Sequence, residues 1–444
     1  MKKLLLIFLL LPLSMLAQNQ YVDSSYTGTS TGTISQPWKA MSSINQAALN
    51  AGDSVLFKAP YQYAGNMTIT KGGTSGNAIV YTSYGTGRAT LIGTGSTITA
   101  LFYMNGPDYV TFTNFNITDP TLDANDPTRS ELAKIQRAFY VDGASNHIIT
   151  SYMNVDLVGV GVYWVGGNNT MMYCDYGNMR MVEDDPGGFN DYGANPVTIG
   201  DGSDNNLVTH CNLHDLWAHS YDFGLDGGAF EMYSLSGSLD NNIFEYNFIN
   251  DGIGVSEITG NTDGFHFRYN IIINNGSFLN FQNGYTHANT TVINNVFVLT
   301  EVSPVGDSRL YYGSPQDLTM TNNLYYMRAG CDVASTGTGI TNTYNRYNLG
   351  SGSTTGMSAG TGEVSSTTPV WVSMTGDETT WDYHLLFAVP GKPGGTGLNI
   401  DYYSVTGSND YMGVAKYVST PPPSGNTIKF PVKINGVIYK GWKN

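Results

Sequence analysis

Short stretches in which apolar and polar residues alternate recur along most of this 444-residue chain. In one typical stretch, Phe265, Phe267 and Tyr269 occupy every second position, and Gly, Asn, Asp or Ser residues bound each such stretch. A period of two residues is that of a β-strand, whereas an amphipathic helix repeats its apolar positions every 3.6 residues. The pattern therefore predicts an all-β protein of many short strands separated by turns.

A turn, an Asn and then an apolar residue mark most of the repeats. The residues at this marked position are Asn114, Asn154, Asn212, Asn247, Asn270, Asn295, Asn323 and Asn348, with Asp175 in one imperfect copy. Successive copies lie 21–28 residues apart, except for three intervals of 35–40 residues. This period, combined with strand-type alternation, predicts a solenoid of stacked β-coils. Because stacked amides can bond to one another along the axis, we expect an Asn ladder.

The repeats make the chain resemble the right-handed parallel β-helix proteins of the pectin-lyase-like superfamily over residues 20–417. Further residues that carry the resemblance are Gln36-Pro37-Trp38-Lys39, Gly52-Asp53-Ser54-Val55-Leu56-Phe57, Trp381-Asp382-Tyr383-His384-Leu385 and Asp410-Tyr411-Met412-Gly413-Val414. The resemblance implies an all-β, single-stranded right-handed parallel β-helix with an N-terminal capping helix. Residues 39–50 fit that cap, with Met41, Ile44 and Leu49 as apolar positions. A fold of this kind does not by itself choose an activity.

The two ends of the chain have compositions of their own. Residues 1–17 combine Lys2 and Lys3 with a short apolar run and a small residue at Ala17, which predicts a secretory signal peptide. We therefore expect a secreted or extracytoplasmic protein without a membrane span in its mature part. Residues 18–417 form the expected β-helix, and residues 418–444 a Pro-rich linker and short tail. The chain has three Cys residues, an odd number that leaves at least one thiol unpaired, so it is not a disulfide scaffold.

The three long intervals indicate insertions at the same place in neighbouring coils, around residues 118–137, 178–195 and 213–228. Insertions at equivalent places emerge on one side of a solenoid, so we expect them to form one wall of a groove. Beside this wall, the segments 229–233, 255–259 and 278–282 align by their distance from the turn. Alternation then points Glu231, Glu257 and Asn280 outward in one row.

Two glutamates on neighbouring coils are about 5 Å apart, the spacing of adjacent strands. Carboxylates this close raise the pKa of one of them or bind a cation. A shared proton supplies an acid and a base, which glycoside hydrolysis requires. We therefore predict Glu231 and Glu257 as catalytic residues, with Asp226 from the third insertion as a further carboxylate. The alternative is that both glutamates are merely solvated side chains.

Residues around the expected groove are candidates for holding a sugar. Aromatic side chains pack on the apolar faces of sugar rings, and polar side chains bind their hydroxyls. The predicted substrate-binding residues are Trp217, Tyr221, Tyr233, Asn280 and Arg137.

The charge distribution limits the substrate. The chain carries a net charge of −15, and between residues 141 and 300 there are 18 Asp and Glu against two Arg. Such a surface repels nucleic acid and polyuronates alike. A neutral glycan is consistent with this charge and requires no cofactor. A lyase acting on uronates would require bound Ca²⁺, for which Glu183, Asp184 and Asp185 are the candidate ligands. Its candidate bases are Lys134, Arg137 and His219.

Three functions follow, in this order. The first is a polysaccharide-active enzyme that cleaves glycosidic bonds in a groove on the β-helix with paired carboxylates. The second is a Ca²⁺-assisted polysaccharide lyase or epimerase. The third is a glycan-binding or surface adhesion protein without catalytic activity. In each case a polysaccharide is the expected partner, and we expect a monomer.

Overall fold

The computed structural model describes residues 18–300 except 189 and 283, and then residues 311–313, 317–327, 339–348, 360–362, 364–366, 371–373, 379, 382–385, 432–434 and 437–439. The predicted signal peptide, Cys331, the segment around Asp410 and the start of the predicted linker lie outside these residues. No helix in the described part of the chain is long and apolar enough to cross a membrane.

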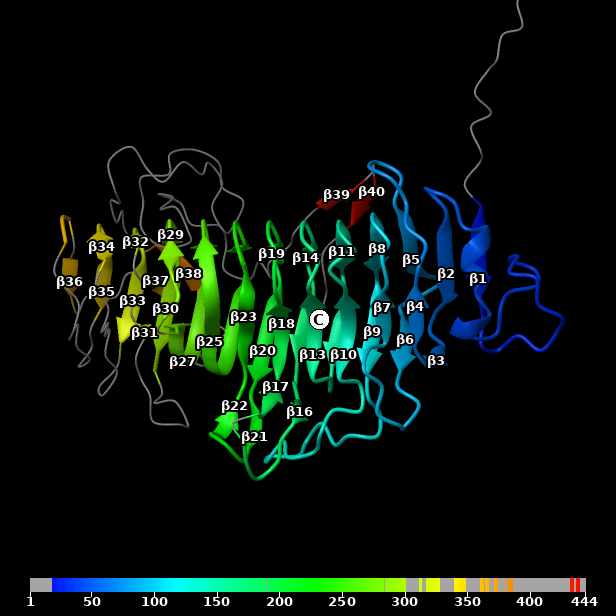
Figure 1. Cartoon of the computed structure of the whole chain (residues 1–444), viewed down its shortest axis with the longest axis horizontal. Coiled ribbons are helices and arrows are strands. Elements are labelled where there is room, and N and C mark those ends of the chain that lie inside the picture. The colour runs from blue at the N-terminus through cyan, green and yellow to red at the C-terminus, as the bar shows by residue number, and fades with distance from the viewer. Residues whose placement is uncertain are drawn as a thin grey trace, which may run out of the picture.

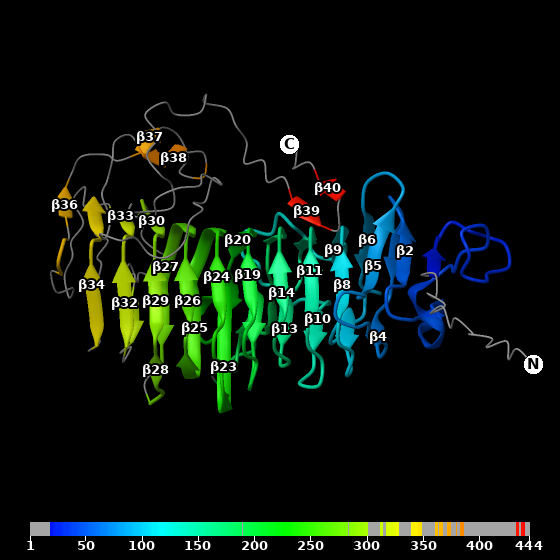
Figure 2. The same cartoon turned by 90° about the horizontal axis from the view of Figure 1, so that it is seen from above.

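The described residues form a parallel β-helix, an elongated stack of coils whose axis is horizontal in Figure 1. One strand from each coil joins a 12-stranded parallel sheet, seen along the side of the stack in Figure 2. Its strands are β1 (Asn19–Val22), β2 (Ser54–Lys58), β5 (Ile79–Tyr84), β8 (Val110–Thr113), β11 (Ile148–Ser151), β14 (Thr170–Met172), β19 (Leu207–Thr209), β24 (Ile243–Glu245), β26 (His266–Arg268), β29 (Thr290–Ile293), β32 (Leu318–Thr321) and β34 (Ile340–Thr343).

The remaining strands of the coils form a 20-stranded sheet that contains two further rows. The row that follows each turn comprises β3 (Gln62–Ala64), β6 (Ala89–Ile92), β9 (Phe115–Thr118), β12 (Asn154–Asp156), β15 (Asp175–Gly177), β20 (Asn212–Leu216), β30 (Val296–Leu299), β33 (Leu324–Met327), β35 (Arg346–Asn348) and β36 (Val364–Ser366). The other strands are β4 (Met67–Ile69), β7 (Phe102–Met104), β10 (Arg137–Val141), β13 (Val160–Trp164), β18 (Asn195–Ile199), β23 (Gly228–Ser238), β25 (Phe248–Asp263), β27 (Ile271–Phe281), β28 (His287–Ala288) and β31 (Tyr311–Gly313).

Strands β25 and β27 belong to both rows of the larger sheet. The first part of β25 pairs with β20, and its second part pairs with β23. Likewise, the first part of β27 pairs with β30 and its second part with β31. In the coils that contain β25 and β27, a single strand therefore continues from one row of the sheet into the other. The sheet is continuous at this place, and it carries the outward row described below.

Within the described residues, four antiparallel strand pairs lie outside the coils. They are β16 (Met181–Glu183) with β17 (Tyr192–Gly193), β21 (Ala218–Ser220) with β22 (Gly224–Asp226), β37 (Trp371–Ser373) with β38 (Asp382–Leu385), and β39 (Val432–Ile434) with β40 (Val437–Tyr439). The first two arise from the second and third predicted insertions, and Figure 1 shows them together at the lower edge of the stack. The structure thus confirms that these insertions emerge on one side.

Apolar side chains of alternate strand residues fill the inside of the stack. Val55 and Phe57 on β2, Tyr81 on β5 and Phe112 on β8 are fully buried, and the same core cluster continues to Tyr347. Phe102 packs between Phe112 and Phe139, with ring centroids 4.7 and 5.4 Å apart. The period-two alternation therefore predicted the inner face correctly.

The prediction of a capping helix at residues 39–50 is wrong. Residues 39–50 contain only two short 3₁₀ turns, η1 (Met41–Ser43) and η2 (Gln46–Ala48), separated by extended backbone at Ile44. Ser and Asn residues compete for backbone hydrogen bonds and weaken a helix this short. Met41, Ile44 and Leu49 are nevertheless buried in the core, so the segment covers the end of the stack without a helix.

The Asn ladder exists, but its members differ from those predicted. Asn247, Asn270, Asn295, Asn323 and Asn345 are buried, and each Nδ2 of the first four donates to the Oδ1 of the next at 3.0–3.1 Å. Asn345 thus takes the place predicted for Asn348, which lies in β35. A second ladder, which the sequence analysis missed, runs through Asn169, Asn206 and Asn242.

The earlier predicted members of the ladder occupy other positions. Asn154, Asp175 and Asn212 pair with one another in neighbouring strands, and Asn212 pairs with Phe248, one residue past the ladder. Asn114 has a φ of 63° and belongs to a row of left-handed turn residues. The other members of this row include Tyr152, Tyr173, His210, Tyr246, Tyr269, Asn294, Asn322 and Tyr344. The Asn repeats thus combine turn, strand and ladder positions, which a single short motif cannot separate.

Candidate active site on the outer face of the β-helix

A row of outward side chains crosses the 20-stranded sheet, one from each neighbouring strand. Backbone pairing aligns Tyr103 on β7, Tyr140 on β10, Tyr163 on β13, Thr198 on β18, Glu231 on β23, Glu257 on β25 and Asn280 on β27. Their neighbours Phe230, Met232 and Ile258 are buried, as are Leu279 and Phe281. The structure therefore places Glu231 and Glu257 side by side on adjacent coils, as the register analysis predicted.

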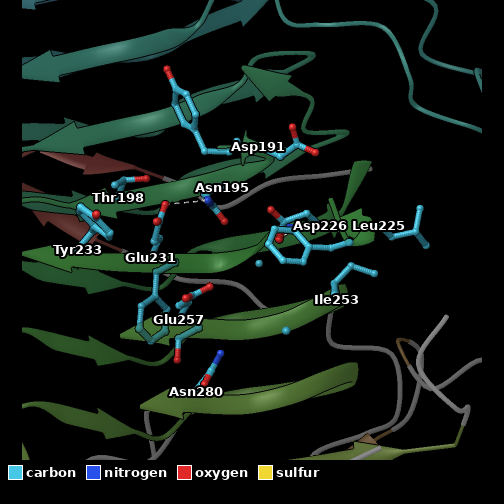
Figure 3. Close-up of a pocket in the computed structure, with 18 of the residues that line it drawn as sticks. Asp191, Asn195, Thr198, Leu225, Asp226, Glu231, Tyr233, Ile253, Glu257 and Asn280 are labelled. Atoms are coloured by element: carbon cyan, nitrogen blue, oxygen red, sulfur yellow. Dashed lines mark hydrogen bonds between the residues drawn. The ribbon is translucent and has the colours of Figure 1, made fainter. Parts of the chain in front are cut away.

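Glu231 lies half-buried in the row, beside other carboxyl groups. Burial, followed by the charges of Glu257 and Asp226, raises its pKa from 4.5 to about 8. The side chain of Asn195 on β18 donates from Nδ2 to Glu231 Oε2 at 3.3 Å. This contact and the strand pairing fix the carboxyl group towards the neighbouring coil (Figure 3).

Glu257 is exposed and lies one strand further along the axis. The side chain of Gln282 donates from Nε2 to Glu257 Oε1 at 2.7 Å. This bond from one amide donor holds the Glu257 side chain in place. The two glutamates thus differ in surroundings: Glu231 is desolvated and Glu257 is solvated.

Asp226 comes to the same place from a different element. It ends β22 in the hairpin of the third insertion, where its Oδ1 accepts a hydrogen bond from the Gly227 N–H at 2.7 Å. Burial is the main cause that raises its pKa to about 6, and the charge of Glu257 adds to this effect. Figure 3 shows Asp226 next to the row that holds Glu231 and Glu257. Three carboxyl groups therefore line one cavity, two of them with a raised pKa.

The hairpins β16–β17 and β21–β22 are bonded into one wall. The carboxylate of Asp191 accepts hydrogen bonds from Ser220 Oγ at 2.8 Å and from the Asp222 N–H at 2.9 Å. In the opposite direction, Asp222 Oδ2 accepts from the Asn190 N–H at 2.9 Å. The loop of the first insertion joins them, since Arg129 donates to the carbonyls of Asp215 and Trp217 and forms an ion pair with Asp215. All three insertions therefore form a common structure.

A cavity of about 840 Å³ lies between this wall and the sheet. Among the described residues, its charged and amide lining residues are Arg137, Asn190, Asp191, Asn195, Asp226, Glu231, Glu257, Asn280 and Gln282. Tyr163, Tyr192, Tyr233 and Phe223 add aromatic surface. A concave site of this size with converging carboxyl groups of raised pKa has the properties expected of an enzyme active site.

The cavity contains some of the predicted binding residues and not others. Tyr233, Asn280 and Arg137 line it, and Tyr233 is 42% exposed. Tyr140 and Tyr163 stack on each other with ring centroids 5.2 Å apart, so one face of each ring is covered.

Three of the predicted catalytic and substrate-binding residues, Trp217, His219 and Tyr221, do not line the cavity. The Trp217 ring lies 4.2 Å from the Arg129 guanidinium, and its Nε1 donates to Asp251. His219 Nδ1 is 2.8 Å from Asp184 Oδ2, and Tyr221, 60% exposed, packs against the His219 ring. The contacts of these residues lie with Arg129, Asp251 and Asp184, none of which lines the cavity. The sequence alone did not show which residues of the third insertion would line the cavity.

Two carboxylates in the acidic run of the second insertion, those of Glu183 and Asp184, are bonded to other residues of the insertions. Glu183 Oε1 accepts a hydrogen bond from Asn190, and Asp184 binds His219 and the Tyr221 N–H. Among the residues that the structure describes, no three His, Cys, Asp or Glu side chains converge as metal ligands would. The Glu183 and Asp184 side chains stabilise the wall instead.

The sequence analysis missed three residues that complete the site. Gln282 is the next outward residue after Asn280 on the same alignment, so strand alternation was a sufficient signal for it. Asn195 precedes Thr198 on β18, a strand that had not been aligned with β23. Tyr192 comes from the β16–β17 hairpin, and no repeat pattern predicts a hairpin inserted between coils.

Comparisons with known proteins support the fold. No family model matches the chain, and no curated protein sequence matches it. Among solved structures, a rhamnogalacturonan lyase aligns with a TM-score of 0.52 and 13% identity over 73% of this chain and 85% of its own. The structure described as the complex of XylC with xylose aligns with a TM-score of 0.53 and 8% identity over 90% and 98%. At these identities the comparisons establish a shared architecture: the chain is a parallel β-helix protein, as its sequence resemblance implied.

Proposed function

We propose that this chain is a glycoside hydrolase in which Glu231 is the general acid and Glu257 the nucleophile. The observation that carries the proposal is the in-register pair on β23 and β25, with one glutamate desolvated and the other exposed. A carboxylic acid that stays protonated at pH 7 can donate its proton to the leaving oxygen of a glycosidic bond. An ionised neighbour can attack or stabilise the anomeric carbon.

The spacing of the pair suggests the stereochemical course. Side chains in register on adjacent parallel strands are separated by about 4.8 Å at the backbone. A carboxyl separation of about 5 Å is characteristic of retaining glycosidases, whereas inverting enzymes leave room for a water molecule. In the first step Glu231 protonates the departing oxygen while Glu257 forms a glycosyl ester. In the second step Glu231 takes a proton from a water molecule, and the oxygen of that water attacks the sugar and breaks the glycosyl ester. This step restores the acid form of Glu231 and the carboxylate of Glu257.

Asp226 has a supporting role in this proposal. Its negative charge contributes to the raised pKa of Glu231, and so favours the acid form required for the first step. It reaches the carboxyl pair from the wall, so the insertions and the sheet would both contribute to catalysis. Tyr233, Asn280 and Asn195 line the same cavity and would bind sugar hydroxyls. The xylose bound in a protein with the same architecture is consistent with a carbohydrate substrate.

The test is digestion of a panel of polysaccharides, with reducing ends and ultraviolet absorbance measured together. We expect new reducing ends without absorbance, because hydrolysis leaves no double bond. Glu231→Gln and Glu257→Gln each lower the rate by about 10²–10⁴-fold. Glu131→Gln, an exposed glutamate outside the cavity, is the matched control and keeps the wild-type rate.

Other outcomes of this panel distinguish the alternatives. Ultraviolet absorbance from a double bond in the product would show a lyase. Loss of that activity in EDTA would show that the lyase requires Ca²⁺. Binding without either product would show a glycan-binding or adhesion protein. Reducing ends that persist in both glutamine variants would contradict the proposed pair. Secretion follows only from the predicted signal peptide at residues 1–17 and remains a prediction.

A further inference from the structure

Arg137 differs from every other charged residue in the cavity. The remaining charged residues of the lining are Asp191, Asp226, Glu231 and Glu257, so Arg137 is the one cation among the described lining residues. It begins β10, a strand that precedes β23 and β25 along the β-helix, and it lines the cavity. A cation that the fold holds beside four carboxyl groups would be expected to pair with one of them.

Arg137 instead has aromatic neighbours. Its guanidinium lies 5.1 Å from the Tyr163 ring centroid, 5.7 Å from that of Tyr140 and 5.8 Å from that of Tyr192. Its Nη2 donates to the Tyr192 hydroxyl at 3.3 Å. Within the described part of the chain it has no ion pair, and its buried Nε has no hydrogen-bond partner. The three rings orient the guanidinium while they leave donors unused.

We infer that Arg137 binds an anionic substituent of the glycan, a carboxylate or a sulfate, at a subsite distinct from the carboxyl pair. A planar guanidinium with unused donors is suited to two parallel hydrogen bonds with such a group. Tyr192 and Tyr163 would exclude water around that contact, which strengthens it. This inference rests on the proposed function for the rest of the site, and it names the class of substrate.

The surrounding charges limit how many anionic groups the substrate carries. Arg137 can neutralise one negative charge, whereas Asp191, Asp226, Glu231 and Glu257 repel further ones. A chain in which every sugar is a uronate would place a carboxylate next to the catalytic pair. The substrate is therefore a mainly neutral glycan with isolated acidic groups, and the acidic group lies upstream of the cleaved bond along the β-helix axis.

Binding to the Glu231→Gln protein, which would not degrade its ligand, tests this inference apart from the chemistry. The probes are glucose, glucuronic acid and glucose 6-sulfate, which differ only in the charged group, together with a hexamer of galacturonic acid. We expect at least one of the two anionic sugars to bind about tenfold or more tightly than glucose, and this preference to weaken at high salt. The preferred anion identifies the substituent. We expect the hexamer to bind no more tightly than the preferred single sugar.

Adding Arg137→Met to this protein removes the anionic preference, whereas adding Lys134→Met does not. Lys134 precedes β10 in the sequence and lies outside the cavity, so it controls for the loss of one positive charge. Equal binding of glucose and both anionic sugars, or a preference that survives Arg137→Met, would overturn the inference. So would tighter binding of the hexamer. None of these outcomes alters the assignment of Glu231 and Glu257. Conversely, anionic preference without any cleavage by the wild-type protein would retain the subsite and reject the hydrolase.

Discussion

At the scale of single residues, the site depends on two glutamates in different surroundings. Identical side chains on adjacent strands acquire different chemistry because one is desolvated beside two other carboxyl groups and the other is exposed. The sequence predicted that they would be neighbours, because strand alternation and turn position fix the register. It did not predict which would hold the proton, since that depends on the hairpin that brings Asp226 over Glu231.

The raised pKa of Glu231 has a direct kinetic consequence. Because the general acid must be protonated, kcat/KM falls as the pH rises through about 8. Glu257→Gln removes a negative charge that contributes to this shift, so the pKa of Glu231 decreases in that variant. Titration of the ¹³C-labelled Glu231 carboxyl group by NMR measures its pKa in the wild-type protein and in Glu257→Gln. A wild-type pKa near 4.5 would contradict the assignment of the acid.

The same group makes stability depend on pH. A carboxyl whose pKa is higher in the folded state than in the unfolded state binds its proton more tightly when folded. Its favourable contribution is present below about pH 4.5 and is lost as the pH rises to about 8. Glu231→Gln therefore raises Tm relative to wild type at pH 9 and changes it little at pH 4. Thermal unfolding at both pH values tests this expectation, and Glu131→Gln should show no such difference.

At the scale of elements, the Asn residues show how much a short motif can predict. Asn247, Asn270, Asn295 and Asn323 were predicted as ladder members and are buried in it. Asn154 and Asn212 were predicted with them, but they are exposed strand residues. Met153, Cys174 and Cys211 precede the corresponding strands, so apolar packing replaces the ladder in the earlier coils. Composition shows that Asn is frequent. Only the strand register tells the buried ladder positions from the exposed strand positions.

This difference predicts unequal costs for the same substitution. Asn270→Ala leaves the Asn247 N–H and Nδ2 without their acceptor in a buried place, so we expect a loss of about 2–4 kcal/mol of unfolding free energy. Asn212→Ala removes an exposed contact with Asp175 and should cost less than about 0.5 kcal/mol. Urea unfolding of the two variants provides the comparison. Equal effects would mean that the ladder contributes no more than a surface amide.

At the scale of the whole molecule, segments about 85 residues apart in the sequence form one wall. The positions of the three insertions were predictable, because each lengthens one repeat. Their hairpin conformations and mutual contacts were not, since the repeat period carries no information about inserted residues. The wall therefore explains why Trp217, Tyr221 and His219 were assigned to a groove from which the structure separates them.

A substitution of Arg129 tests the importance of this wall. Arg129 lies outside the cavity and links the first insertion to the third. Arg129→Ala removes its ion pair with Asp215 and its bonds to two carbonyls. We expect faster hydrogen exchange over residues 213–228 and a decrease in kcat/KM of about tenfold, because Asp226 loses its fixed place. Arg268→Ala breaks an ion pair on another face and is the control. Unchanged exchange in Arg129→Ala would show that the hairpins are held by other contacts.

The continuous strands β25 and β27 have a consequence for how the protein acquires its site during folding. In a solenoid each coil contacts only its neighbours, so ordered structure can spread outward from any coil that forms early. Glu231, Glu257 and Asn280 lie on three successive coils, and no distant segment has to arrive before they are aligned. During synthesis, the finished edge of β18 would template β23, then β25, then β27. The carboxyl pair would thus be assembled before the last coils leave the ribosome.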